Sequence, residues 1–369
     1  MEHENNFDLL RLFAASQVVY LHSVFHLQLP RGGMLFDILS AFPGVTCFFI
    51  ISGFLVSKSW LDSSPAAYVI KRALRIYPAL IANIAVLDLA MYLTGGFLQP
   101  VQWLKYPVHF ILFAASASDY FADGINGVLF YGRGFFNGYP SGVLWTLTVE
   151  LSFYAVLPIP LEIYRRSKLA GAIVLAAMMI GSFLLDYGAS EQFRAQHPLL
   201  NVTVPFYFWI FGIGIAARML WPWLDRVVRN RMALWLPAYL VLDMIISMTV
   251  EMPPGGLLYL DTNGAPTMVT ALRVCLLALA LLSCAYSFPR ASRVLCGYDL
   301  SYAIYLYHML VVTTLASLGV TGTAWLWPVI YGASAAIAWL SWRYIEAPAL
   351  RAKRAVSAAA AMAFRAVTS

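Results

Sequence analysis

The chain has 369 residues, of which 61% are hydrophobic and 11% are charged, and its mean hydropathy is +0.73. An average soluble domain has roughly 25% charged and about 45–50% apolar residues, so this composition excludes a soluble globular protein. The net charge of +6 comes from Lys and Arg residues in the short segments between apolar runs. That pattern reflects membrane topology and requires no nucleic-acid partner.

The apolar runs follow one another from residue 7 to about residue 345 without a long polar stretch. A membrane-spanning helix needs about 20 mostly apolar residues. Ten runs meet this requirement, at residues 8–28, 36–57, 76–94, 144–164, 169–187, 202–219, 233–250, 268–287, 299–319 and 324–343. We therefore predict an all-α, polytopic membrane helix bundle of about ten transmembrane helices, with one membrane domain over 1–348 and no soluble domain.

The basic residues predict the orientation of this bundle. If the N-terminus lies in the cytoplasm, five of the 24 Lys and Arg residues fall outside and the other 19 fall inside. The five are Arg31, Lys105, Arg133, Arg194 and Arg273. The positive-inside rule therefore places both termini in the cytoplasm, together with a basic, Ala-rich tail at residues 349–369.

Two neighbouring segments are expected at the outer surface. Residues 101–117 are apolar, but the segment is short and carries Lys105 and His109, so we predict that it is re-entrant or interfacial. The Gly-rich and aromatic residues 118–143 would then form an external loop.

The first span contains four ionisable residues, Asp8, Arg11, His22 and His26. Ionisable groups at membrane depth are costly, so they mark functional sites by default. Arg11 and His22 are eleven residues apart, which is about 16 Å along a helix axis and places them close to one face. The alternative is structural, with Arg11 extending to lipid headgroups and His22 making a hydrogen bond between helices.

A metal site is not expected at these histidines. His22 and His26 are spaced i, i+4, as two metal ligands on one helix can be, but no acidic residue or Cys is spaced to complete the set. The four cysteines show no C-x-x-C spacing, so they predict neither a zinc site nor a disulfide framework.

A basic cluster precedes the third span. Lys71, Arg72 and Arg75 lie about one helical turn apart at its inner end. Forked guanidinium groups bind phosphates well, so this cluster is a candidate site for a phosphorylated cytoplasmic ligand. The alternative is that these residues only anchor the span by the positive-inside rule.

The fourth span carries a carboxylate. Glu150 lies about two turns from the outer end, after Trp145. It either accepts a hydrogen bond from His22 and orients that ring, or pairs with a neighbouring Arg or Tyr in the bundle.

The ninth span has a polar face. Ser301, Tyr305 and His308 share one side of the expected helix, and Tyr302 lies nearby. This face either lines a polar site or packs against another helix.

Six short motifs occur along the chain. They are, in order, Asp8, Arg11 and His22; Phe48, Phe49, Ser52, Gly53 and Phe54; Arg72 and Arg75; Trp145, Leu147 and Glu150; Ser301, Tyr302, Tyr305 and His308; and Glu346 and Pro348. In this order they resemble the acyltransferase-3 family of integral membrane acyltransferases, over about residues 7–348. Two positions depart from the family pattern: Thr46 stands where many members have Asp, and Ala347 stands where the closing motif has Arg.

The resemblance implies an O-acyltransferase of the bacterial plasma (inner) membrane. It would move an acyl group, acetyl in the simplest case, from cytoplasmic acyl-CoA to a hydroxyl of a carbohydrate acceptor, such as a surface polysaccharide or its lipid-linked precursor. Acyl-CoA is then a substrate, and no permanent cofactor or metal is expected. The implied catalytic residues are His22, Glu150 and Arg11; the acyl-CoA residues are Arg72, Arg75 and Lys71; the lining residues are Asp8, Ser52, Trp145, Tyr302, Tyr305 and His308.

Acyl transfer requires an acceptor hydroxyl, a base that takes its proton, and donors that hold the developing oxyanion. His22 is the well-placed residue whose ordinary pKa lies near neutrality. Direct transfer and a covalent acyl-His22 intermediate both remain open. A proton-coupled secondary transporter is the alternative from another class, although the sequence lacks the inverted repeats that such carriers usually show.

Overall fold

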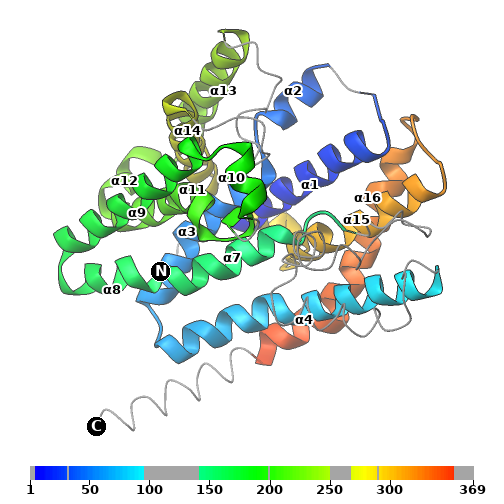
Figure 1. Ribbon diagram of the computed structural model, residues 1–369, viewed down its shortest axis with the longest axis horizontal. Helices are drawn as coiled ribbons and strands as arrows, with labels where there is room; N and C mark the ends of the chain where they lie inside the picture. The colour runs from blue at the N-terminus through cyan, green and yellow to red at the C-terminus, as the bar shows by residue number, and fades with distance from the viewer. Residues whose placement is uncertain are drawn as a thin grey trace. The chain divides into compact units, whose positions relative to one another are not determined.

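The computed structural model describes residues 5–30, 33–94, 141–197, 200–249, 267–288 and 291–352, and Figure 1 shows their path. Within these residues the chain forms helices and no strand. The expected re-entrant segment at 101–117 lies outside the described residues, as do the expected loop up to residue 140 and the tail from residue 353 onward.

The helices follow the apolar runs of the sequence. In chain order they are α1 (Phe7–His26), α2 (Met34–Ser40), α3 (Gly44–Leu61), α4 (Pro65–Leu93), α7 (Trp145–Val156), α8 (Pro158–Arg166), α9 (Lys168–Gly188), α10 (Glu191–Gln196), η2 (Leu200–Val202), α11 (Val204–Met219), α12 (Trp221–Val228), α13 (Met232–Thr249), α14 (Met268–Ala285), η3 (Ala291–Leu295), α15 (Ser301–Ser317), α16 (Leu326–Ser341) and the π-helix η4 (Trp342–Glu346).

Several of these helices have the length and apolar composition of membrane-spanning helices. Among the described residues, five stretches are long and apolar enough by length and composition: Gly44–Leu61, Trp145–Arg166, Lys168–Gly188, Leu200–Met219 and Met268–Ala285. The other predicted spans coincide with α1, α4, α13, α15 and α16. The predicted all-α, multi-pass membrane fold is confirmed.

Two of the predicted spans are interrupted in the structure. The span expected at 36–57 is divided into α2 and α3, because Pro43 lacks an amide hydrogen and the amide of Gly44 donates to Gln17 Oε1 (2.7 Å). The span expected at 144–164 is divided into α7 and α8 at Leu157, since Pro158 opens a new helix.

The third predicted span is longer than expected. A helix was expected over 76–94, whereas α4 runs continuously for 29 residues from Pro65. Ser64 caps its first turn by accepting a hydrogen bond from the amide of Ala67 (3.3 Å), and proline is favourable at the first helical position. The basic cluster therefore lies within this helix and not ahead of it.

The described helices group into two compact units, each drawing on several parts of the chain. The first unit takes in the described residues of 1–18, 31–58 and 155–301, and the second those of 19–30, 59–154 and 302–369. The predicted domain limit at residue 348 stays a prediction.

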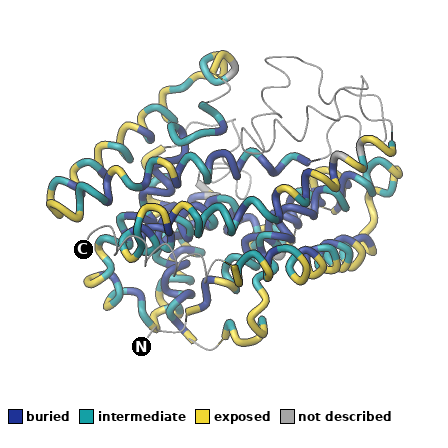
Figure 2. The backbone as a smooth tube through the Cα atoms, turned by 90° about the horizontal axis from the view of Figure 1, so that it is seen from below, coloured by how far each residue is buried: buried dark blue, intermediate teal, exposed yellow. Residues whose placement is uncertain are grey.

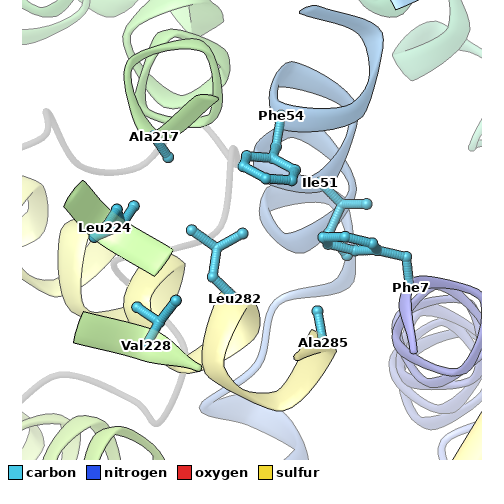
Figure 3. Packing of buried hydrophobic residues seen from close by; sticks show 8 residues of the cluster. All are labelled: Phe7, Ile51, Phe54, Ala217, Leu224, Val228, Leu282 and Ala285. Carbon is cyan, nitrogen blue, oxygen red and sulfur yellow. The ribbon is translucent and has the colours of Figure 1, made fainter. Parts of the chain in front are cut away.

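The first unit has a core of side chains from α1, α3, α11, α12 and α14. Figure 3 shows its members Phe7, Ile51, Phe54, Ala217, Leu224, Val228, Leu282 and Ala285. The rings of Phe7 and Phe54 lie 5.6 Å apart, and both also pack against the ring of Tyr286. Helices distant in sequence are therefore joined by aromatic contacts in this unit.

Close packing of α3 against α11 in the first unit depends on two glycines. A Cβ atom on Gly53 of α3 would overlap the carbonyl oxygen of Phe211 in α11, and one on Gly214 would overlap the carbonyl oxygen of Ile50. Small residues allow helix backbones in membranes to approach closely. The Ser-Gly-Phe motif of α3 therefore supplies a helix crossing.

One face of α9 is apolar and exposed. Leu169, Ile173, Ile180 and Leu184 are all exposed, and at 100° per residue they fall within about 60° of one another around the helix. The exposed stretches of the chain are yellow in Figure 2. An exposed apolar stripe of this kind suits contact with lipid tails.

The first unit also buries an ion pair, and one of its partners was expected elsewhere. Arg273 was expected outside the membrane, but it lies inside α14, only 1% exposed, and its guanidinium pairs with the carboxylate of Asp243 on α13. The hydroxyl of Tyr239 donates to the carbonyl of Ala41 beside this pair. A buried charge needs such a partner, so Arg273 links α13 to α14. Its position therefore does not indicate which side of the membrane this end of α14 faces.

The second unit is organised around α15. The hydroxyl of Tyr302 donates to the carbonyl of Ile76 in α4 (3.0 Å), and the side-chain amide of Asn83 donates to the carbonyl of Leu306 (3.2 Å). Asn83 is fully buried, so these bonds form away from water. They fix the register of α15 against α4.

Candidate active site

Three histidines meet in the second unit. The ring of His22 on α1 lies 5.3 Å from the ring of His308 on α15, nearly perpendicular to it, and 5.7 Å from the ring of His26. His308 is fully buried, His22 is half-buried and His26 is exposed. Among the described residues, no group of three or more His, Cys, Asp or Glu side chains is arranged to hold a metal ion.

The proton of neutral His308 is fixed on one ring nitrogen. Its Nδ1 lies 2.9 Å from the carbonyl oxygen of Tyr305 and 3.2 Å from that of Ile304. A carbonyl oxygen only accepts, so Nδ1 carries the hydrogen and Nε2 keeps its lone pair. Nε2 of His308 and Nδ1 of His22 are both buried without a hydrogen-bond partner in the described part of the chain.

Two contacts hold the end of α1 beside α15 and α16. The amide of Gly322 donates to the carbonyl of Leu27 (2.8 Å), just past the end of α1. The rings of Tyr20 and Trp327 are stacked with centroids 4.8 Å apart. These contacts lie on either side of His22 along the chain, so they limit how far its ring can move from His308.

An arginine and tyrosine cluster forms a second polar region of the same unit. The guanidinium of Arg72 lies 5.7 Å from the centre of the Tyr154 ring, and that of Arg75 lies 5.6 Å from the centre of the Tyr302 ring. Stacking on an aromatic face holds a guanidinium in place while its edge stays open to an anion. Nε of Arg72 is buried without a hydrogen-bond partner among the described residues.

The neighbouring basic residue has a different setting. Nζ of Lys71 donates to the hydroxyl of Ser63 (2.5 Å), which lies just ahead of α4. Lys71 therefore faces the start of its own helix, while Arg72 and Arg75 face tyrosines from α7 and α15.

Glu150 lies close to the arginine and tyrosine cluster. Its carboxylate accepts a hydrogen bond from the hydroxyl of Tyr154, one turn further along α7. Tyr154 is the residue on which Arg72 stacks. Of the two roles that the sequence left open for Glu150, the structure thus shows pairing with a neighbouring Tyr.

The two polar regions are connected along α15. Tyr302 belongs to the arginine and tyrosine cluster, and His308 belongs to the histidine cluster of His22, His26 and His308. The two residues are six positions apart on the helix, which is about 9 Å along its axis. Tyr305 lies between them, and its hydroxyl bonds with the hydroxyl of Thr146 (2.6 Å) and the carbonyl of Val143 (3.1 Å) at the start of α7. One helix therefore carries polar groups from the arginines to the histidines.

Other predicted site residues lie in the first unit. Arg11 pairs with Asp8 (3.0 Å) and is 3.9 Å from Asp299, and Asp299 accepts a hydrogen bond from the hydroxyl of Ser301 (2.6 Å). Ser52 is a half-buried residue of α3, beside the helix crossing at Gly53. Arg11 is thus part of an ion-pair network at the start of α1.

The remaining lining residue and two unpredicted ones belong to the second unit. Trp145 is the half-buried first residue of α7. Tyr68 and Tyr154 were not among the predicted site residues, although the hydroxyl of Tyr68 donates to the carbonyl of Tyr154 (3.1 Å) beside Arg72. Their i, i+4 spacing from Arg72 and Glu150 places each on the same helix face as its charged neighbour, which is the signal that could have identified them.

Comparison with known proteins bears on what this arrangement does. The acyltransferase-domain family matches residues 4–343, which is nearly the whole chain. The chain belongs to this acyltransferase family. It is therefore a multi-pass membrane acyltransferase, and of acyl transfer and secondary transport, the two functions that the sequence left open, the family match favours acyl transfer.

Three relatives resemble this acyltransferase. Nodulation protein 10 of Rhizobium leguminosarum bv. viciae is 42% identical over 363 residues, which cover 96% of each chain. A putative membrane-bound transacylase of Komagataeibacter xylinus is 27% identical over 224 residues, covering 58% of this chain and 50% of that protein. The O-acetyl transferase of Shigella phage Sf6 is 30% identical over 225 residues, covering 58% and 63%. No solved structure matches the acyltransferase.

Proposed function

We propose that this acyltransferase moves an acyl group, acetyl in the simplest case, from acyl-CoA to a hydroxyl of a carbohydrate acceptor. The observation that carries the proposal is the arrangement of the second unit, where two arginines stacked on tyrosines and a cluster of three histidines contact two positions of the same helix, α15. A donor with phosphates at one end and a reactive thioester at the other suits these two regions.

The donor side of the site is the arginine and tyrosine cluster. Arg72 and Arg75 present guanidinium groups held on tyrosine rings, and Lys71 adds a third positive charge on the same helix. Phosphates of acyl-CoA would accept charge-assisted hydrogen bonds from these groups. Glu150 contributes by fixing Tyr154, on which Arg72 stacks.

The reaction centre in this proposal is His22. Its neutral ring takes the proton of the acceptor hydroxyl as the hydroxyl oxygen attacks the thioester carbonyl carbon. The tetrahedral intermediate then collapses, the carbon–sulfur bond breaks, and the proton passes from His22 to the departing CoA sulfur. An ester and free CoA result, so atoms and charge balance without another reactant.

The cellular setting follows from the donor. Acyl-CoA is a cytoplasmic compound, so we place the arginine cluster toward the cytoplasm of a bacterial inner membrane, with both termini inside. One relative is named an O-acetyl transferase and another a membrane-bound transacylase, which supports acetyl as the acyl group and an oxygen acceptor. A surface polysaccharide or its lipid-linked precursor is the carbohydrate we expect.

The experiment that tests this function uses purified protein in liposomes with radiolabelled acetyl-CoA. Adding cell-envelope carbohydrate from a strain that lacks the gene should move label from the thioester to ester-linked sugar. A label that stays on CoA, under conditions in which the protein binds acetyl-CoA, contradicts the proposal. Restored glycan O-acetylation on re-expression in that strain would identify the acceptor.

A further inference from the structure

The histidine cluster contains an arrangement that base catalysis by His22 alone does not use. His308 is fully buried, and its Nε2 has no hydrogen-bond partner in the described part of the chain. Nδ1 of His22 is likewise buried and unpartnered there. Buried polar nitrogens are normally hydrogen-bonded, so two that remain unpaired on adjacent rings require an explanation.

The chemistry of the two nitrogens is complementary. The carbonyls of Ile304 and Tyr305 fix the hydrogen of His308 on Nδ1, which leaves a lone pair on Nε2. The free nitrogen of His308 is therefore an acceptor. If the tautomer of His22 carries its hydrogen on Nδ1, that nitrogen is a donor.

The distance between the rings is short enough for such a bond to form. Their centroids lie 5.3 Å apart with an angle of 82° between the ring planes, a separation that a hydrogen bond between facing ring nitrogens spans once the His22 ring turns its Nδ1 toward His308. His308 is held by two backbone carbonyls of its own helix, so His22 is the ring that moves. Catalytic hydrogen bonds are often long in a free enzyme and shorten when substrate binds.

We propose that His308 is a positioning residue for His22, accepting a hydrogen bond from its Nδ1–H so that the lone pair of His22 resides on Nε2 and faces the acceptor hydroxyl. This inference rests on the proposed role of His22 as the base. His308 would orient the ring, select its tautomer and stabilise the ring when it takes the proton. In many catalytic triads a carboxylate orients and stabilises the histidine in this way.

The sequence left two roles open for Glu150, of which one was to orient His22 and the other was to pair with a neighbouring Arg or Tyr. The structure shows its carboxylate accepting a hydrogen bond from the hydroxyl of Tyr154 on its own helix. His26 is the other ring beside His22, but it is stacked at 19° and exposed, so it has no fixed geometry toward Nδ1 of His22. Of the two histidine rings beside His22, His308 is the one that is buried and held by hydrogen bonds.

Two matched variants test the proposal. In His308→Gln the side-chain amide reaches the position of Nε2 and keeps an acceptor there, whereas in His308→Asn it reaches only the position of Nδ1. We expect His308→Asn to lower kcat about 10²-fold, the scale of a misoriented catalytic group. The KM for acetyl-CoA should not change, and His308→Gln should retain most of the kcat. A structural role would not separate the two variants in this way.

A double variant shows whether His308 acts through His22. Combining His308→Asn with His22→Ala should lower kcat no further than His22→Ala alone, since a positioning residue has no effect once its ring is gone. Independent, multiplying losses would overturn the proposal. So would equal losses in His308→Gln and His308→Asn at matched expression and thermal stability. This comparison does not use His308→Gln, so it stands even when that variant fails to fold.

The same assay separates failure of this inference from failure of the proposed function. If His22→Ala is inactive and His308→Asn keeps normal kcat, the inference is wrong and the function stands. If His22→Ala transfers acetyl groups at the normal rate, the base assignment itself is wrong. His197→Ala, at an exposed histidine of the first unit, is the control, and it should leave kcat nearly unchanged.

Discussion

Arg72 differs from other basic residues of the chain in its surroundings. Its guanidinium lies over the Tyr154 ring, and its Nε is buried without a hydrogen-bond partner among the described residues, while the side chain of Arg166 is 81% exposed. Replacing Arg72 with Ala should weaken acyl-CoA binding by about 1–3 kcal/mol, the range for a hydrogen bond to a charged group. Isothermal titration of purified variants would measure this as roughly a 5–150-fold rise in Kd.

The control for this prediction is Arg166→Ala, which should leave Kd unchanged. Arg72→Lys should fall between wild type and Arg72→Ala, because Lys keeps the charge but loses the planar fork. Equal affinity in wild type, Arg72→Ala, Arg72→Lys and Arg166→Ala would show that Arg72 only helps to set the orientation of its helix in the membrane.

The buried pair of Arg273 and Asp243 predicts a stability effect. Removing one partner leaves an unpaired buried charge, so Arg273→Ala should lower the free energy of unfolding by about 3–5 kcal/mol. Replacing both residues with Met and Leu removes both charges and should recover part of that loss. Thermal unfolding in detergent measures the difference, and a double variant as unstable as the sum of the single variants would contradict this account.

At the scale of helices, Gly53 predicts a packing effect. A Cβ atom there would overlap a backbone oxygen of α11, which cannot turn aside as a side chain can. Gly53→Ala should therefore destabilise the protein by about 1–3 kcal/mol, the usual cost of overpacking. The matched control is Gly181→Ala in α9, where no atom lies within 4 Å and Ala only improves helix propensity. Equal thermal stability in the two variants would argue against a close crossing of α3 and α11.

Hydropathy predicts that a helix exists better than it predicts where the helix ends. The apolar windows identified α9, α11 and α14 within a few residues, because, apart from Arg273 in α14, their charged residues and the proline of α11 lie near the helix ends. The same windows excluded the first turns of α4, where charged residues lower the average although Ser64 and Pro65 begin a helix there. The breaks at Pro43 and Pro158 were missed because a window average does not register a single lost amide hydrogen.

The candidate site was predictable as residue types but not as pairs. The spacing of Arg11 with His22 and of Arg72 with Arg75 identifies candidate residues within one helix. A sequence does not reveal that His308 faces His22, or that Tyr302 supports Arg75, since these contacts join helices far apart along the chain. For the same reason Arg273 was assigned by its charge to the outside, although its partner lies on the preceding helix.

For the whole molecule, the distribution of basic residues predicts the orientation. α9 begins after Ser167 and ends at Gly188, so its two ends report opposite sides of the membrane. With the native cysteines replaced, a Cys at Gly188 should react with an impermeant maleimide in intact cells, while a Cys at Ser167 should react only after lysis. The opposite pattern would place both termini outside.

Catalysis by His22 is the central claim about the whole molecule, and single-turnover transfer from radiolabelled acetyl-CoA in liposomes tests it most directly. His22→Ala should insert normally, bind acetyl-CoA with unchanged Kd, and transfer label about 10²–10⁴-fold more slowly, the usual effect of removing a positioned base. His26→Ala, which changes the neighbouring ring, should transfer label at close to the normal rate. Near-normal transfer by His22→Ala at equal expression would contradict the account.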